Sequence, residues 1–160
     1  MFNELGFLLI DFSEPKTLAA ILKMNTYTGV KTLIITGGKN HVAPVNLSSI
    51  LASTSSMKLD QLFIINFKNH LTELPASIAN QGQLEYLGLF NNQLTELPPA
   101  VFGFSSLKTL HIDLNPISEL PSFVANLVNL QELGIAGTQL DAKQHERLKQ
   151  YLPNCKILSE

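Results

Sequence analysis

The sequence predicts an α/β solenoid, in which short parallel strands stack into one curved sheet and helical or irregular segments cover the other side. Leucine and asparagine are unusually frequent, with 28 and 13 of the 160 residues. A leucine template recurs with a shift of 23 residues, and a proline-containing half-repeat recurs between its copies. This periodicity indicates repeated coils, because a single short coil can bury its apolar face only against its neighbours.

The clearest copies of the template L-x-x-L-x-L-x-x-N-x-L are residues 84–94 and 107–117. A third copy starts at Leu130, with Thr138 at the asparagine position, and we align the run 62–71 as the copy before them. In each copy, alternate apolar residues would point to one side of a short strand and form the core. The half-repeats begin with Leu-Pro, which suits a backbone leaving the sheet, because proline fixes φ and donates no hydrogen bond. They start at Leu74, Leu97 and Leu120.

These motifs resemble the leucine-rich repeat family, in its short bacterial intracellular type, over about residues 62–140. The tail 140–158 is similar to the helix and strand that end many such proteins. The resemblance implies a leucine-rich-repeat solenoid, a right-handed curved stack with a parallel sheet on the concave face. Short helices, 3-10 helices or irregular segments would lie on the convex face. It also implies a protein-binding role, without naming the partner.

We expect one solenoid domain over residues 1–160. A small separate α/β cap remains the alternative for the first third of the chain. Within that third, the sequence predicts helices over 14–24 and over 47–52. The three expected parts are irregular helix-bearing N-terminal coils (1–61), regular repeats (62–140) and a C-terminal cap (141–160).

The charge balance and cysteine content exclude several kinds of partner and site. Eleven basic and 13 acidic residues give a net charge of −2, which provides no basic surface for nucleic acid or an anionic membrane. The single cysteine, Cys155, cannot form an internal disulfide, which favours the cytoplasm, with non-classical export left open. The first 12 residues carry no positive charge typical of a signal peptide, and no apolar stretch is long enough for a membrane helix.

The template asparagines are expected to be structural. An amide side chain has both a donor and an acceptor, so it can satisfy backbone groups of its own turn and of the next coil. This predicted ladder consists of Asn69, Asn92 and Asn115.

The outward positions of the strands would line the concave surface. Tyr86 and Phe90 are aromatic on a face that the core does not require, which is typical of an interaction hot spot. Gly88 and Gly134 are expected to let a partner approach the backbone. The open alternative is that Tyr86 and Phe90 only cover one another and their neighbours. The predicted partner-binding residues are Ile64, Asn66, Lys68, Tyr86, Gly88, Phe90, Thr109, His111, Asp113 and Glu132.

The sequence predicts no catalytic, cofactor or metal site. Thr109, His111 and Asp113 share a face, but residues two apart on a strand are roughly 6.5–7 Å apart, so contact requires their side chains to lean together. With Glu132 they could hold at most an adventitious divalent ion. The glycine turn at 37–38 lacks P-loop spacing, and the histidines form no zinc-binding pattern. The expected function is a non-catalytic protein–protein interaction module, monomeric or weakly homo-oligomeric. The alternatives are self-assembly through the N-terminal edge strand and a secreted effector that binds a host protein.

Overall fold

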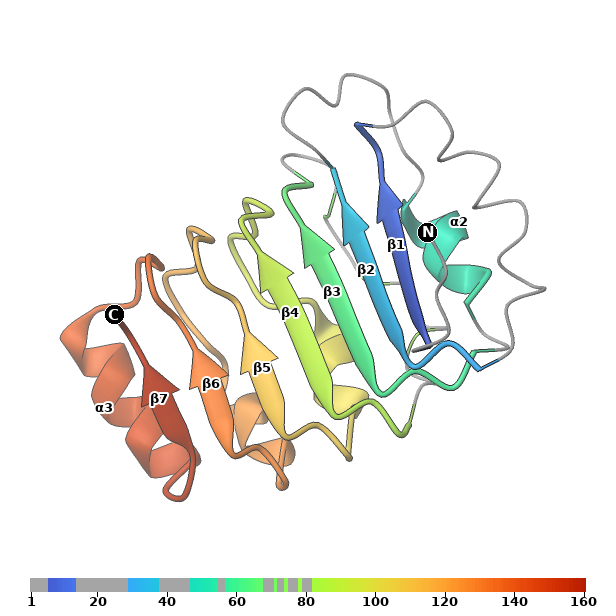
Figure 1. Ribbon diagram of the computed structural model, residues 1–160. Helices are drawn as coiled ribbons and strands as arrows, with labels where there is room; N and C mark the ends of the chain where they lie inside the picture. Colours follow the sequence, from blue (N-terminus) through green and yellow to red (C-terminus); the bar gives the residue numbers. More distant parts are fainter. Residues whose placement is uncertain are drawn as a thin grey trace.

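The computed structural model describes residues 6–13, 29–37, 47–54, 57–67, 71, 74, 78 and 82–160. Within these residues, seven strands form one parallel sheet and follow one another in chain order (Figure 1). The strands are β1 (Phe7–Asp11), β2 (Thr32–Thr36), β3 (Gln61–Ile65), β4 (Tyr86–Phe90), β5 (Thr109–His111), β6 (Glu132–Gly134) and β7 (Lys156–Leu158). The predicted solenoid of parallel strands is therefore confirmed.

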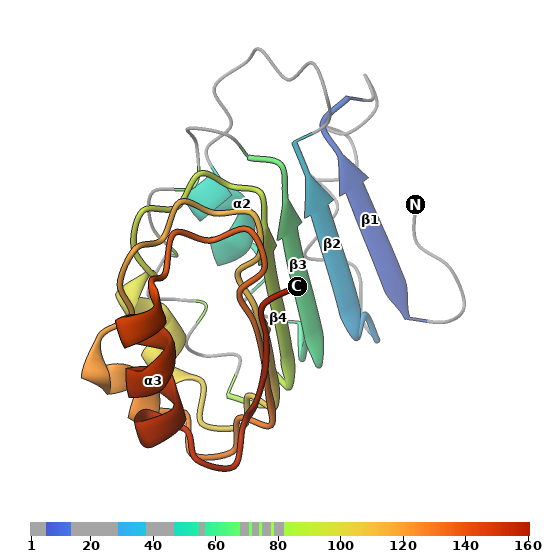
Figure 2. The same ribbon diagram turned by 90° about the vertical axis from the view of Figure 1, so that its left-hand side faces the viewer.

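Where the structure describes the chain, the helical segments lie on one side of this sheet (Figure 2). They are the α-helices α2 (Leu47–Ala52) and α3 (Ala142–Tyr151), and the 3-10 helices η3 (Pro99–Gly103) and η4 (Ser122–Asn126). Helix α2 covers the residues predicted to be helical, whereas the helix predicted over 14–24 lies outside the described residues. In the described part of the chain, no helix is long and apolar enough to cross a membrane.

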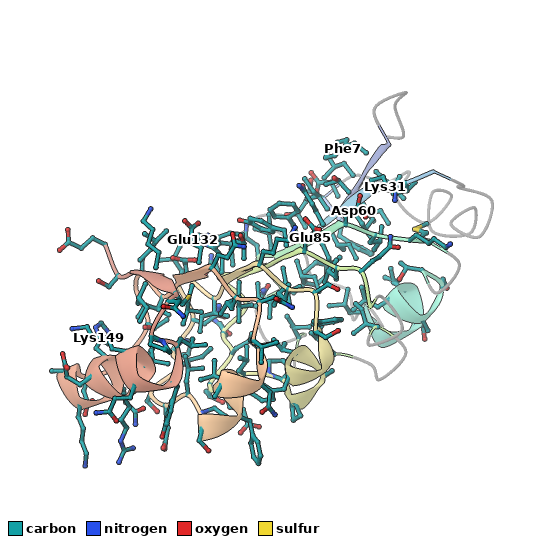
Figure 3. All side chains as sticks on the ribbon, turned by 90° about the horizontal axis from the view of Figure 1, so that it is seen from below. Phe7, Lys31, Asp60, Glu85, Glu132 and Lys149 are labelled. Carbon is teal, nitrogen blue, oxygen red and sulfur yellow. The ribbon has the colours of Figure 1, made fainter. Side chains whose placement is uncertain are left out.

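The core fills the space between the two layers, as the side chains in Figure 3 show. Strands β1 to β4 each turn two apolar residues inwards. These residues lie opposite one another on neighbouring strands, so that Leu33 pairs with Leu62 and Leu62 pairs with Leu87. The Leu-Pro half-repeats lead into η3 and η4, which bury Val101 and Val124 beneath the sheet. Every coil thus covers the apolar face of its neighbours, which stabilises the stack.

Asparagine side chains connect consecutive coils from the inside. Asn115 is fully buried, and its Oδ1 accepts hydrogen bonds from the backbone N–H groups of Asn92 (2.9 Å) and Leu94 (3.0 Å). Its Nδ2 donates to the carbonyls of Leu89 (2.6 Å) and Ile112 (2.9 Å). Asn92 makes equivalent bonds one coil earlier, to the N–H of Phe67 and the carbonyl of Ile64. Asn69 lies outside the described residues.

The register of β3 corrects the predicted alignment. Leu62 and Ile64 point inwards opposite Leu87 and Leu89, and Ile64 is 0% exposed, so its predicted place on the concave surface is wrong. The template of this coil starts at Leu59, and the coil is two residues longer than the next one. The predicted and observed registers differ by three residues. Because side chains alternate along a strand, a shift by an odd number of residues exchanges the two faces. The outward residues of β3 are Gln61, Phe63 and Ile65.

Asn66 is also displaced from the outward strand position at which it was predicted. It follows β3 with a positive φ of 62° and accepts a hydrogen bond from Asn91 Nδ2 at 2.7 Å. This contact places it at the rim of the sheet. Lys68, which was predicted beside it, lies outside the described residues.

Candidate interaction surface

Four aromatic side chains surround Gly88 on the concave face of the sheet. Tyr86 and Phe90 lie two residues before and after it on β4, whereas Phe63 on β3 and His111 on β5 lie directly opposite it. We call these four side chains the aromatic cluster. The ring of Tyr86 lies 4.6 Å from that of Phe63 and stacks on that of His111 at 5.7 Å, and Phe90 lies 5.5 Å from His111. All four remain partly exposed.

Phe63 belongs to this cluster although the sequence analysis missed it. The predicted register put Ile64, and not Phe63, on the concave surface. The spacing Leu59-x-x-Leu62-x-Ile64 carries the same template as the later coils, but Leu62-x-x-Ile65-x-Phe67 fits that template as well. The cluster therefore joins three strands, and not only β4 and β5.

The two glycines of the surface have a different role from the predicted one. A Cβ atom at Gly88 would collide with the ring of Phe90 and come within 3.0 Å of Phe63 Cδ1. A Cβ atom at Gly134 would collide with the His111 ring and come within 2.6 Å of Asp113 Oδ2. Side chains of the protein already occupy the space above both glycines. The glycines therefore leave room for the Phe90 and His111 rings above the sheet.

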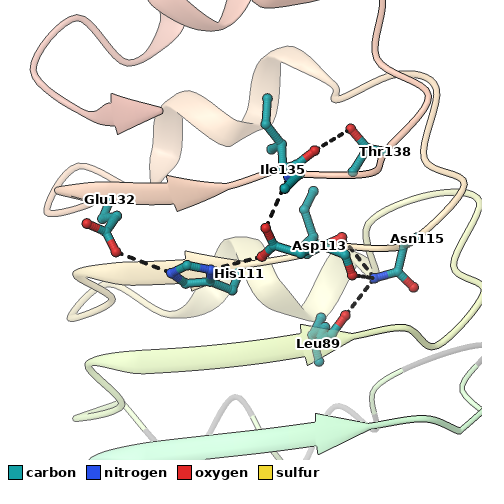
Figure 4. A network of polar contacts seen from close by, with 9 residues as sticks. Leu89, His111, Asp113, Asn115, Glu132, Ile135 and Thr138 are labelled. Carbon is teal, nitrogen blue, oxygen red and sulfur yellow. Dashed lines mark hydrogen bonds and ion pairs between the residues drawn. The ribbon is translucent and has the colours of Figure 1, made fainter. Parts of the chain in front are cut away.

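Carboxylates hold both nitrogens of the His111 ring. Nδ1 lies 2.9 Å from Asp113 Oδ2, and Nε2 lies 3.2 Å from Glu132 Oε1 on the neighbouring strand (Figure 4). Asp113 Oδ1 also accepts a hydrogen bond from the backbone N–H of Ala136 at 3.0 Å, and Lys156 Nζ lies 3.7 Å from Glu132 Oε2. The side chains of His111 and Asp113 thus lean together despite their spacing along the strand, because Gly134 leaves room for the ring.

This arrangement does not form a nucleophile with its general base. A base must lie within hydrogen-bonding reach of the group that it deprotonates. The ring nitrogens of His111 face Asp113 and Glu132, and neither faces the Thr109 hydroxyl. Among the described residues, no group of three or more histidine, cysteine, aspartate or glutamate side chains could hold a metal ion.

The two carboxylates create a negative potential over the aromatic cluster. Partial burial raises the pKa of the Tyr86 hydroxyl, and the negative charges of Asp113 and Glu132 raise it further. The same charges that oppose ionisation of Tyr86 would attract a cation to this part of the surface.

We expect Gly134→Ala to separate His111 from Asp113, because the new methyl group needs the space that both side chains occupy. The His111 ring resonances should shift in two-dimensional NMR spectra, and the unfolding free energy should fall by about 1–3 kcal/mol from overpacking. The control is Gly82→Ala, since a Cβ at Gly82 meets no atom within 4 Å. Unchanged His111 resonances in Gly134→Ala would contradict this geometry.

We expect Cys155 to react slowly with alkylating agents. Partial burial, assisted by the negative charge of Glu132, raises the pKa of the Cys155 thiol to about 11. Only the thiolate reacts, so its fraction at pH 8 should be about 100-fold lower than for an ordinary cysteine and should increase up to about pH 11. Iodoacetamide labelling followed by mass spectrometry measures this rate, with the urea-unfolded chain as the control. Equal rates for the two states would refute the expectation.

The parallel ladder, the buried asparagines and the aromatic concave face together define a leucine-rich-repeat solenoid. Residues 82–140 match the family model described as leucine rich repeat. Residues 82–140 therefore carry leucine-rich repeats, and the chain has the leucine-rich-repeat fold that the resemblance in its sequence implied.

Two solved structures show the same fold. A leucine-rich repeat protein from Leptospira interrogans superposes with a TM-score of 0.58 at 24% identity, over 81% of this chain and 37% of that one. An internalin from Listeria monocytogenes superposes with a TM-score of 0.56 at 22% identity, over 86% of this chain and 44% of that one. The chain thus matches less than half the length of either protein. No curated protein matches it.

Proposed function

We propose that the chain is a non-catalytic interaction module that binds a protein or peptide on the concave face between β3 and β6. The observation that carries this proposal is the aromatic cluster, which lies on the sheet face opposite the hydrophobic core. Aromatic residues are enriched at the centres of protein interfaces, where they contribute large contact areas. Leucine-rich repeat proteins also generally bind protein partners, which supports this kind of role.

The cluster also continues into an apolar strip. Ile65 on β3 and Ile34 on β2 point to the same face and are partly exposed. The rings do contact one another, so part of their apolar area is already covered within the chain. A strip of partly exposed apolar side chains with carboxylates at one end nevertheless has the composition of an interface with a polar rim.

Affinity capture from a lysate of the source cells tests the proposal with three forms of the protein. The wild type should capture a partner that Tyr86→Ala/Phe90→Ala loses, because the double variant removes two central rings. The control, Phe123→Ala/Val128→Ala, removes two exposed apolar side chains outside the concave face and should retain the partner. Circular dichroism verifies that all three forms are folded. Retention by the concave variant together with loss by the control would place the interface elsewhere.

A further inference from the structure

We propose that the bound partner inserts an arginine side chain over the aromatic cluster, beside the carboxylates of Asp113 and Glu132. This inference rests on the proposed function, and it adds the chemistry that the surface recognises.

The rings of the cluster lie close enough together to contact a single cation. Gly88 is their common neighbour, and the successive ring centroids are separated by 4.6, 5.7 and 5.5 Å. A cation is attracted to the face of an aromatic ring within about 6 Å of its centroid, and several rings around one point add their contributions. A cation on the solvent side of the cluster, outside the Phe90 ring that covers Gly88, would therefore meet more than one ring at once.

The charges beside the cluster also favour a cation. Asp113 and Glu132 flank His111, and both turn one oxygen towards its ring. On β7, Lys156 has a side chain that is 71% exposed, and its Nζ lies 3.7 Å from Glu132 Oε2. This loose pair leaves Glu132, at 34% exposure, accessible to a second donor. Burial raises the pKa of the Tyr86 hydroxyl, and the negative charges of Asp113 and Glu132 raise it further.

Arginine matches this combination better than lysine does. Its planar guanidinium stacks on aromatic faces and directs N–H groups sideways within its own plane. Stacked on Tyr86 or Phe90, it could donate to the Glu132 carboxylate at the edge of the cluster. Acidic or phosphorylated segments would instead be repelled by the two carboxylates.

A pair of matched peptides tests this inference directly. The probes are acetylated and amidated Gly-Arg-Gly and Gly-citrulline-Gly, because citrulline has nearly the shape of arginine without its charge. Amide NMR spectra of the full chain are recorded during titration with each probe. We expect saturable shifts at Gly88 and His111 with the arginine peptide, and at least about tenfold weaker binding of the citrulline peptide.

Three variants locate the effect. Phe90→Leu removes a ring but keeps an apolar side chain, and Glu132→Gln removes a charge but keeps the shape. Each should weaken binding of the arginine peptide by about three- to tenfold. The matched control is Glu119→Gln, because Glu119 is exposed and pairs with Arg147 away from the cluster, and this variant should bind as the wild type does.

Equal affinity for the two peptides, no saturable shift with either, or binding that survives both Phe90→Leu and Glu132→Gln would overturn the inference. These outcomes are distinguishable from failure of the proposed function. Suppose that Tyr86→Ala/Phe90→Ala loses the captured partner but the wild type shows no preference for the arginine peptide. The proposed interface would then stand, and only its preference for a cation would be rejected.

Discussion

Replacing Asn115 by alanine is expected to lower the free energy of unfolding by about 3–5 kcal/mol. The substitution removes the acceptor of the backbone N–H groups of Asn92 and Leu94. It also removes the donor to the carbonyls of Leu89 and Ile112. Each buried backbone group that loses its partner costs about 1–3 kcal/mol, and relaxation around the alanine recovers part of the sum. Urea unfolding followed by circular dichroism measures the change.

Asn129→Ala is the matched control for this substitution. Asn129 is exposed, and its side chain makes one hydrogen bond, to the carbonyl of Ser105 at 2.7 Å. Water can replace that partner, so we expect a loss below about 1 kcal/mol. If Asn115→Ala were no more destabilising than Asn129→Ala, the asparagine ladder would not stabilise the stack as its geometry indicates.

Removal of residues 1–61 is expected to abolish the cooperative thermal transition of the remaining chain. The deletion takes away β1 and β2 together with the first residue of β3. Leu62 and Ile64 would lose their neighbours Leu33 and Ile35 and would face water at the new end of the stack. Because each coil is stabilised mainly by its neighbours, an uncovered terminal coil destabilises the coils that follow it. Differential scanning calorimetry of residues 62–160 measures the transition.

A second truncation controls for shortening the chain as such. Ser159 and Glu160 are exposed and follow β7, so their removal leaves the buried residues intact. This variant should melt as the full chain does. A cooperative transition of the 62–160 fragment near the melting temperature of the full chain would show that the regular repeats are stable without the N-terminal coils.

The regular coils could be predicted closely because their template is local. In the coils that start at Leu84 and Leu107, the leucine positions alternate in a way that assigns one face of each strand to the core. The structure buries Leu87, Leu89, Leu110 and Ile112 accordingly. Asn92 and Asn115 could be assigned for the same reason, because each lies at the same place in its template. In the coil before them, the register of β3 puts Phe67 at this place instead of the predicted Asn69.

The first regular coil shows where local pattern is insufficient. Ile64 and Ile65 are both apolar, so either could belong to the core. Pairing decides between them, because Leu62 must lie opposite Leu87 for the two coils to share hydrogen bonds and a buried face. The resulting register places Ile64 inside and Phe63 in the aromatic cluster.

The sequence by itself determined the repeated coil, the residues that form its core in the regular repeats and the face on which Tyr86, Phe90 and His111 lie. The tertiary structure decided how that face is built. It placed Phe63 beside Tyr86, folded Phe90 over Gly88, and held His111 above Gly134 between Asp113 and Glu132. These contacts join residues from different strands, so they depend on the register between coils and on the space above each glycine. The residue pattern within one repeat specifies neither the register between coils nor the space above a glycine.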